Sequence, residues 1–330
     1  MIPVSHRPRE PCSIRTFKLD RIIAMCTSSI AIVVPTLDAA LDWPHLSRLG
    51  EGGVPPEHVL IVDSSSSDGT PELARTAGFR VHTIARDQFN HGGTRQLAAE
   101  LLPGAEILVL LTQDTVLLDG DAIKKLLNAF TDPNVAAAFG RQLPRSKATP
   151  IEAHARLYNY PGRSESRTLA SRERFGIKSI FLSNSFAAYR RDALMSVGGF
   201  PKHVIFGEDT VTAAKLLLAG WKIAYVAEAQ VHHSHSYTWL QEFRRYFDIG
   251  VLHSRESWLI EEFGSAGNEG SRFVRSQLNY LWPRHVELLP SALIRTALKF
   301  GGYRLGRIER KLSLKWKQRL SMNRQFWRQQ

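Results

Sequence analysis

Short apolar runs that end in polar residues recur through the first 140 residues of this chain. Strands are predicted at Ile30–Pro35, His58–Asp63, Gly78–Ile84, Glu106–Leu111 and Val135–Phe139. Helices are predicted between them, at Leu41–Leu49, from Thr70 onward, at Thr94–Leu102 and at Asp119–Phe130. Strands that alternate with helices predict a mostly parallel sheet covered on both faces. Ligands of such sheets bind beyond the carboxyl ends of the strands, so residues at those ends are the first candidates for a site.

Composition limits the class of protein. Hydrophobic residues make up 43% of the chain, which supports a packed core rather than disorder. The two cysteines, Cys12 and Cys26, are expected to be free thiols, as in a reducing compartment. No apolar run reaches the about 18 residues that span a bilayer. Arg21–Ser29 is too short for a secretory signal and has no convincing cleavage site.

The chain is expected to have three parts. Residues 1–29 lack a clear period and are predicted to form a loose tail, with Met25 as a second candidate for the true start. Residues 30–240 hold the strands and helices, and residues 241–330 are predicted to be mainly helical. Beyond residue 140 the predicted elements are a helix near Ile151–Tyr158, a bent strand at Lys178–Tyr189, a helix at Glu208–Ala219, a strand at Trp221–Val226 and a polar turn at Gln230–Ser236.

Positive charge is concentrated at the C-terminal end. The chain carries a net charge of +12, and residues 291–330 contain eleven cations against a single acid, Glu309. Apolar residues such as Phe300 and Trp316 are interleaved with these cations. Such a segment predicts an anionic partner, either nucleic acid or an acidic membrane surface.

Asp63 and Asp114 each follow a predicted buried strand. The carboxylate of Asp63 can accept from the imide N–H of a pyrimidine, and the loop Ser64–Gly69 suits a ribose or a phosphate; an Asp-rich turn with a helix cap is the alternative. Asp114 can ligate Mg²⁺ or Mn²⁺ bridging two phosphates, or can simply end a strand. Gly92-Gly93 would let the backbone approach a ligand, and Arg95 could pair with a phosphate or fix Asp114.

Two further groups carry chemistry. Glu208-Asp209 follows Gly207 at a predicted helix start, where an acid serves either as a general base or as a partner of the helix dipole. His232-His233-Ser234-His235 offers metal or substrate contacts, or is a polar surface turn. A structural zinc site would call for cysteine partners at regular spacing, and the two cysteines lie in the N-terminal stretch.

These features, in order along residues 30–240, resemble the family 2 inverting glycosyltransferases of the GT-A fold. The matching segments are Val33-Val34-Pro35-Thr36, Val62–Asp68, Asp114 and Gly207-Glu208-Asp209. More narrowly, Phe89–Arg95 with Thr112-Gln113-Asp114 resembles bacterial rhamnosyltransferases of polysaccharide assembly. The resemblance implies an α/β GT-A domain, with a nucleotide-sugar half at 30–140 and an acceptor half at 141–240, and a C-terminal helical extension.

The resemblance also implies roles for single residues. Asp63 would read the thymine of dTDP-L-rhamnose, and Asp209 would be the base, with Glu208 as its rival. Asp114 would hold Mg²⁺ or Mn²⁺, with His233 as a further ligand and His235 as the fallback. Many relatives carry two or three acids where this chain has Gln113-Asp114, so we expect help from histidine. The other expected nucleotide-sugar contacts are Pro35, Thr36, Ser65, Asp68, Gly93, Arg95 and Gln113. From their place on the strand before the base, Ser183 and Asn184 are expected either to line the acceptor site or to be ordinary polar residues of that strand.

The implied reaction is a direct displacement by an acceptor hydroxyl, with the metal and Arg95 stabilising the departing diphosphate. A lipid-linked saccharide acceptor in bacterial O-antigen, capsule or other cell-surface polysaccharide synthesis would explain the basic segment 291–330. The enzyme would then lie in the bacterial cytoplasm, on the inner face of the plasma membrane.

Four alternatives stay open. One is another nucleotide sugar as donor, such as a UDP-hexose or UDP-galactofuranose. A nucleic-acid-binding protein lacks support, because no helix-turn-helix, zinc finger or aromatic RNA-binding motif is present. A nicotinamide-dependent dehydrogenase would need a Gly-x-Gly-x-x-Gly turn where Pro35-Thr36 stands. The fourth, a catalytically dead sugar-nucleotide binder, is disfavoured by the presence of Glu208-Asp209.

Overall fold

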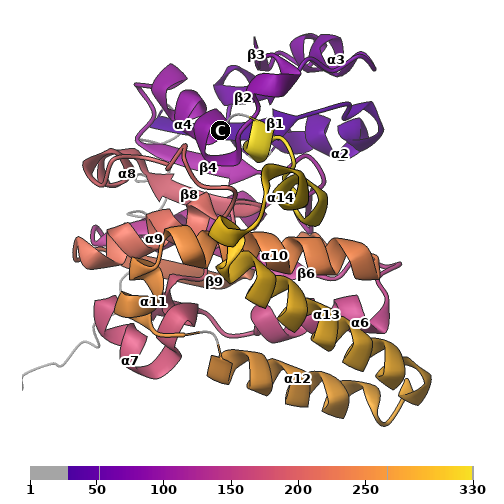
Figure 1. Ribbon diagram of the computed structural model, residues 1–330. Helices are drawn as coiled ribbons and strands as arrows, with labels where there is room; N and C mark the ends of the chain where they lie inside the picture. Colours follow the sequence, from indigo (N-terminus) through magenta and orange to yellow (C-terminus); the bar gives the residue numbers. More distant parts are fainter. Residues whose placement is uncertain (1–28, 52, 266, 329–330) are drawn as a thin grey trace, which may run out of the picture.

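The computed structural model describes residues 29–51, 53–265 and 267–328. The predicted N-terminal tail, with Cys12, Met25 and Cys26, lies outside these ranges. A nine-stranded sheet with the order β3-β2-β1-β4-β8-β6-β9-β5 forms the centre of the molecule, and β7 pairs with β9 (Figure 1). The strands are β1 (Ile30–Thr36), β2 (Val59–Asp63), β3 (Arg80–Thr83), β4 (Ile107–Leu111), β5 (Val116–Leu117), β6 (Val135–Leu143), β7 (Glu165–Arg167), β8 (Phe186–Arg190) and β9 (Lys222–His232).

Helices cover both faces of the sheet. The α-helices of the described residues are α2 (Trp43–Leu46), α3 (Thr70–Thr76), α4 (His91–Leu101), α5 (Ala122–Leu127), α6 (Pro150–Asn159), α7 (Arg172–Phe175), α8 (Arg191–Ser196), α9 (Glu208–Leu218), α10 (Trp239–Arg255), α11 (Trp258–Phe263), α12 (Gly267–Leu281), α13 (Leu289–Arg307) and α14 (Leu314–Leu320). No helix in the described ranges combines the length and the hydropathy that crossing a bilayer requires.

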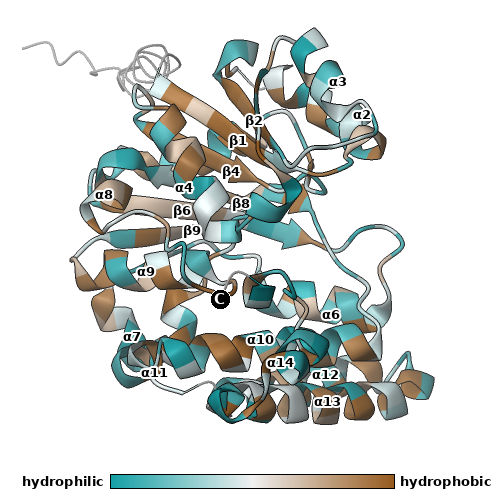
Figure 2. Ribbon diagram, turned by 45° about the horizontal axis from the view of Figure 1, so that its top comes forward, coloured by the Kyte–Doolittle hydropathy of each residue, from teal (hydrophilic) through white to brown (hydrophobic). Residues whose placement is uncertain are grey.

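Alternating side chains of each strand feed two separate cores. On β1, Ala31 and Val33 pack with α4, α8 and α9, whereas Ile32 and Val34 pack with α2, α3 and α5. This alternation follows from the two-residue period of a strand. Because both faces are covered, β1, β2 and β4 are hydrophobic almost throughout, as Figure 2 shows.

The strand directions bring several chain segments to one edge of the sheet. β1 is parallel to β2 and β4, and Thr36 lies opposite Asp63 in the register. β8 runs antiparallel to both β4 and β6, and β9 runs parallel to β6. The carboxyl ends of β1, β2, β4, β6 and β9 therefore share an edge with the start of β8. This edge holds most of the predicted site residues.

Three predicted elements differ from the structure. β9 continues to His232 instead of giving way to a turn, because β6 pairs with it on one side and β5 on the other. α4 begins at His91, so the glycine pair lies in the first helical turn. The segment 178–189 contains a 3₁₀ helix at Gly176–Ile180, and β8 starts only at Phe186. Ser183 and Asn184 therefore precede the strand.

The C-terminal helices are part of the packed molecule. A Cβ on Gly302 would lie 2.3 Å from the carbonyl oxygen of Phe243, and one on Gly306 would lie 2.0 Å from that of Phe247, so α13 rests directly on the backbone of α10. The buried Asp248 of α10 accepts hydrogen bonds from Ser321, Met322 and Asn323. The predicted boundary after residue 240 falls in the first turn of α10.

Candidate active site

Asp114, His233 and His235 converge at the shared edge of the sheet. Asp114 follows β4, and the two histidines follow β9. Asp114 Oδ2 lies 3.4 Å from Nε2 of His233 and 3.7 Å from Nε2 of His235. One ligand atom from each residue lies within 4.8 Å of the others, a spacing at which a metal ion can be held. The structure thus brings together all three predicted metal ligands.

The electrostatics of this cluster suit a cation. Burial raises the pKa of the Asp114 carboxyl, but its interactions with His233 and Thr112 outweigh that effect and hold the pKa well below its usual range. Burial lowers the pKa of His233 despite Asp114, and it lowers the pKa of His235 to about 4. At neutral pH the cluster therefore offers a carboxylate and two neutral rings. Mixed oxygen and imidazole donors fit Mn²⁺ better than Mg²⁺, which prefers oxygen.

Glu208 and Asp209, at the start of α9, have different surroundings. Glu208 Oε1 lies 2.9 Å from Nη1 of Arg95, and both side chains are almost fully buried. It also accepts a hydrogen bond of 3.0 Å from Nδ2 of Asn184. Burial opposes the ionisation of Glu208, but the positive charges of Arg95 and His91 keep its pKa below the usual range. Glu208 is therefore held as a structural anion.

Asp209 is the more available of the two acids. Its side chain is partly exposed, and its oxygens accept from the backbone N–H groups of Thr210 at 2.7 Å and Asn184 at 3.3 Å. Burial and the adjoining charge of Glu208 raise the pKa of Asp209 to about 6. A carboxylate with a raised pKa is a stronger proton acceptor.

The ends of β1 and β2 form a hydrogen-bonded loop system. The fully buried carboxylate of Asp63 accepts from Thr36 at 3.0 Å and from the N–H of Ser66 at 2.8 Å. Asp68 accepts from the N–H of Ala40 at 2.7 Å. Ser65 and Asp68 are exposed, whereas Asp63 is not. Direct contact of Asp63 with a thymine stays a prediction and would require its loop to move.

Gln113 joins the same loop system from β4. Its amide oxygen accepts from the N–H of Leu37 at 2.8 Å, and its amide nitrogen donates to the carbonyl of Leu37 at 3.2 Å. Pro35 lies beside Val62 in the β1–β2 register. The segments that follow β1, β2 and β4 are thus joined by hydrogen bonds, with Ser65 and Asp68 exposed and Thr36 buried.

The Gly92-Gly93-Thr94-Arg95 segment contacts other parts of the protein in this structure, and its predicted contacts with the nucleotide sugar stay a prediction. Arg95 pairs with the buried Glu208 rather than with Asp114, and its side chain is only 5% exposed, so it is not presented to a phosphate. Gly93 donates its N–H to the capping side chain of Asn90 at 2.7 Å. A Cβ on Gly92 would lie 1.9 Å from the carbonyl oxygen of Pro201. The close backbone approach is therefore to the protein itself.

The two predicted acceptor residues lie at the shared edge but are engaged with their neighbours. Asn184 is buried and accepts from the hydroxyl of Tyr189 at 2.7 Å while it donates to Glu208. Ser183 is half-buried and accepts from Gln142 at 3.0 Å. Asn184 therefore orients the acid pair.

Sequence reasoning missed four residues around the histidines. Arg145 lies 3.6 Å from Asp114, and Gln142 lies 2.9 Å from Nδ1 of His233 and 2.6 Å from Nη1 of Arg156. The guanidinium of Arg245 lies over the ring of Phe206 at 5.1 Å, and its charge acts on both His91 and His235. For Arg145 and Arg156 the only signal in the sequence is the Arg-rich character of residues 141–176, which gives no partner, and Gln142 and Arg245 carry no signal.

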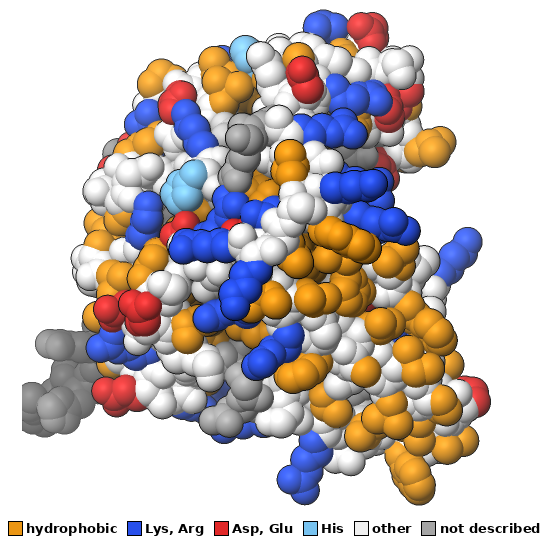
Figure 3. Space-filling model, in the orientation of Figure 1, with side chains coloured by type: hydrophobic (Ala, Val, Ile, Leu, Met, Phe, Trp, Pro, Cys, Tyr) orange, Lys and Arg blue, Asp and Glu red, His pale blue; other side chains and the backbone are white. Residues whose placement is uncertain are grey.

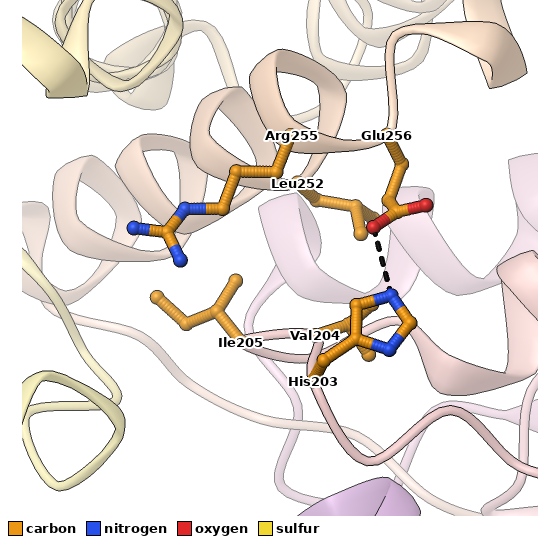
Figure 4. A pocket seen from close by; sticks show the side chains of 6 residues that line it. All are labelled: His203, Val204, Ile205, Leu252, Arg255 and Glu256. Atoms are coloured by element: carbon orange, nitrogen blue, oxygen red, sulfur yellow. Dashed lines mark hydrogen bonds and ion pairs between the residues drawn. The ribbon is translucent and has the colours of Figure 1, made fainter. Parts of the chain in front are cut away.

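Two cavities lie away from the metal cluster. One, of about 280 Å³, is lined by His203, Val204, Ile205, Leu252, Arg255 and Glu256 (Figure 4). Its His203 lies 3.0 Å from Glu256. The other, of about 360 Å³, lies between Asn90-His91 and residues 322–328. Neither is lined by Asp114, Asp209 or His233.

Comparison with known proteins identifies the family. Residues 107–298 match the family described as Glycosyl transferase family group 2. Over 300 residues the chain is 43% identical to the O-antigen chain rhamnosyltransferase RfbN of Salmonella typhimurium (strain LT2). This alignment covers 90% of this chain and 96% of RfbN. The chain is 42% identical over 303 residues to the O-antigen chain rhamnosyltransferase WbaN of Salmonella anatum, with 91% and 96% covered.

Solved structures support the same fold. The mannosyltransferase PcManGT of Pyrobaculum calidifontis, in complex with GDP-Man and Mn²⁺, aligns with a TM-score of 0.53 at 19% identity over 90% of this chain and 85% of that chain. S. aureus TarS 1-349 in complex with UDP aligns with a TM-score of 0.50 at 13% identity over 86% and 91% of the two chains. The chain belongs to glycosyltransferase family 2 and is a glycosyltransferase with the GT-A fold.

Proposed function

We propose that this glycosyltransferase transfers L-rhamnose from dTDP-L-rhamnose to a hydroxyl of a lipid-linked saccharide during O-antigen synthesis. The donor sugar and the pathway are supported by two relatives named as O-antigen chain rhamnosyltransferases, 43% and 42% identical over 96% of their length. The chemistry follows from one observation: Asp209, an available carboxylate with a raised pKa, lies at the same sheet edge as the Asp114–His233–His235 cluster.

Asp209 is the base of the proposed reaction. Its carboxylate takes the proton of the acceptor hydroxyl as that oxygen forms a bond to the anomeric carbon of the sugar. The bond between that carbon and the diphosphate oxygen breaks on the opposite face, so the configuration inverts. Glu208 does not take part, because its carboxylate is held by Arg95 in a buried ion pair. Its charge instead helps to keep the pKa of Asp209 near 6, within reach of a neutral working pH.

The nucleotide is placed on the loop surface of β1, β2 and Gln113. The exposed Ser65 and Asp68 supply hydroxyl and carboxylate contacts there, while the buried Asp63 holds the loop in shape. In this proposal Asp63 supports the base-binding loop, and a direct hydrogen bond to the thymine forms only if the loop opens.

Asp114, His233 and His235 would hold a divalent cation, Mn²⁺ or Mg²⁺. When bound, the cation would supply positive charge that stabilises the departing diphosphate. The protein's own cations at this place are Arg145, which contacts Asp114, and Arg245, which is held between the rings of Phe206 and Tyr237. These two arginines replace Arg95 in the role first predicted for it.

A membrane-facing surface on α12 and α13 would serve the lipid-linked acceptor. Figure 3 shows a broad hydrophobic area over these helices with Lys and Arg side chains along its border. Trp282 is 71% exposed and Phe300 is 66% exposed, and Val286 and Leu293 are exposed as well. Of the cations in this region, Arg295 and Lys299 pair with Glu242, but Arg284, Arg304 and Arg307 are exposed. Exposed apolar side chains bordered by cations fit an anionic bilayer, so we place the enzyme on the inner face of the bacterial plasma membrane.

Calorimetric titration tests the donor assignment. The protein is titrated with dTDP-L-rhamnose in the presence and absence of Mn²⁺ or Mg²⁺, with UDP-glucose and UDP-galactofuranose as controls. The proposal expects tight binding of the dTDP sugar that depends on the metal. Binding of a UDP sugar alone would keep the glycosyltransferase and discard rhamnose as the transferred sugar.

A further inference from the structure

His233 has two ring nitrogens with different partners. Nδ1 lies 2.9 Å from the amide oxygen of Gln142, and Nε2 lies 3.4 Å from Oδ2 of Asp114. A neutral imidazole carries its proton on one nitrogen only, and only the bare nitrogen can bind a metal. Whether His233 can serve as a ligand therefore depends on what fixes its tautomer.

Gln142, on β6, is fixed by partners on both ends of its amide. Its oxygen lies 2.6 Å from Nη1 of Arg156, and its nitrogen donates to the hydroxyl of Ser183 at 3.0 Å. A guanidinium has donors and no acceptor. The amide atom that faces Arg156 must therefore be the oxygen, which rules out the flipped amide. The side chain is only 1% exposed, so water does not compete for it.

The orientation of the Gln142 amide determines which ring nitrogen of His233 carries the proton. The amide oxygen of Gln142 has no proton to give, so Nδ1 of His233 must be the donor in their contact. Nε2 of the neutral ring then presents a lone pair to the carboxylate of Asp114. Two acceptors that face each other at 3.4 Å repel unless a cation lies between them. His235, whose Nε2 also faces Asp114 at 3.7 Å, adds a third donor atom to the same space.

We propose that Gln142 and Arg156 are positioning residues that hold His233 in the Nδ1–H tautomer, so that its Nε2 stays free for a divalent cation. This inference rests on the proposed metal site. Without Gln142, the ring would protonate Nε2 and donate to Asp114, which would close the site with an internal hydrogen bond. With Gln142, the site keeps its lone pairs in place before any metal or nucleotide arrives. Groups that orient a metal-bound histidine in this way change metal affinity about 10–100-fold.

The tautomer is measured first, in the wild-type protein without metal. The ring ¹⁵N shifts of His233, assigned by comparison with His233→Ala, distinguish Nδ1–H from Nε2–H. We expect a protonated Nδ1 and a bare Nε2. A protonated Nε2 would overturn the inference, and this result depends neither on substrate nor on metal binding. It also needs no Gln142 variant to fold.

Affinity for Mn²⁺ alone, followed by electron paramagnetic resonance, is the second readout. Gln142→Leu removes the accepting oxygen and is expected to weaken Mn²⁺ binding about 10–100-fold and to shift the His233 tautomer. Gln142→Glu keeps an acceptor between Arg156 and His233 and is expected to retain both properties. Gln230→Leu, which removes an amide that donates to the carbonyl of Ala227 on the same strand, β9, is the matched control. Equal Mn²⁺ affinity in Gln142→Leu and wild type would refute the positioning role.

Failure of the metal site itself would look different. If the wild-type protein bound no Mn²⁺, with or without dTDP, the proposed metal dependence would be wrong, and the positioning role toward a metal would fall with it. The His233 tautomer would still report whether Gln142 and Arg156 control the ring. The two failures are therefore separated by the experiment.

Discussion

Arg95 and Glu208 form a buried ion pair, with Nη1 and Oε1 2.9 Å apart and both side chains about 5% exposed. The pair joins α4 to the first turn of α9. The two adjacent carboxylates thereby differ in pKa. Arg95 keeps the pKa of Glu208 below the usual range, while burial and the charge of Glu208 raise the pKa of Asp209.

Replacing Asp209 with Asn removes the proposed base without changing the size of the side chain. We expect turnover to fall by at least the about 10²–10⁴-fold that a general base contributes. Binding of dTDP-L-rhamnose should stay close to wild type, because Asp209 does not lie on the nucleotide loop surface. Steady-state rates and donor titration measure the two properties, and a variant with normal turnover would refute the assignment.

The pH dependence of the reaction should report Asp209. The base acts in its ionised form and its pKa is raised to about 6, so kcat/KM should fall as the pH drops through about 6 and should level off above it. Protonation of Asp209 removes the form that acts as a base, so activity is lost at low pH. A profile that stays flat down to pH values near the ordinary pKa of an aspartate, about 4, would contradict the raised pKa.

Breaking the Arg95–Glu208 pair should destabilise the fold. Arg95→Met leaves Glu208 buried without a countercharge, and such losses cost about 3–5 kcal/mol. Adding Glu208→Gln to Arg95→Met should recover part of this loss, because the buried charge is gone. Urea denaturation measures both variants. The exposed pair Arg75–Glu72 supplies the control, since Arg75→Ala should change stability by less than about 1 kcal/mol. Equal losses of stability in Arg75→Ala and Arg95→Met would show that the buried pair contributes no more to folding than an exposed pair.

Removing a metal ligand should remove metal binding. Asp114→Asn replaces the only carboxylate of the cluster that the structure describes, so Mn²⁺ affinity should fall at least about tenfold. Chelation of divalent ions should suppress wild-type activity, and added Mn²⁺ should restore it. His203→Ala, in the separate cavity of Figure 4, changes a histidine outside the cluster and should leave Mn²⁺ affinity unchanged. Full activity in the presence of a chelator would contradict metal dependence.

The membrane-facing surface can be tested without deleting the C-terminal helices, which are packed into the molecule. Trp282→Ser combined with Phe300→Ser changes two of the most exposed apolar side chains. Co-sedimentation with vesicles rich in phosphatidylglycerol should decrease severalfold, and wild-type binding should weaken as salt rises. Leu73→Ser, an exposed apolar change on α3, is the control. Unchanged vesicle binding in the double variant would rule out this surface.

Much of the fold was predictable because it depends on local patterns. The strand runs around Val33, Val62 and Leu110 are buried on both faces, so they are apolar throughout and stand out in the sequence. Since the carboxyl ends of parallel strands share one edge, the joint placement of Asp63 and Asp114 followed directly.

The contacts that the sequence does not predict depend on tertiary packing. Arg95 has the charge to bind phosphate, but only the packing of α4 against α9 shows that it forms an ion pair with Glu208. The polar second half of β9 looked like a turn, because a register shift opposite Gly140–Arg141 interrupts its alternation. Gln142 carries no motif, and its role depends on three partners that are far from it in the sequence.

The most direct test of the proposed function is transfer itself. Purified protein, Mn²⁺, dTDP-L-rhamnose and a lipid-linked saccharide acceptor are incubated, and the product is analysed by mass spectrometry and NMR. We predict one added deoxyhexose, linked with the anomeric configuration opposite to that of the donor, and no product with the Asp209→Asn protein. Transfer from a UDP sugar in preference to dTDP-L-rhamnose, or retention of the donor configuration, would contradict the account.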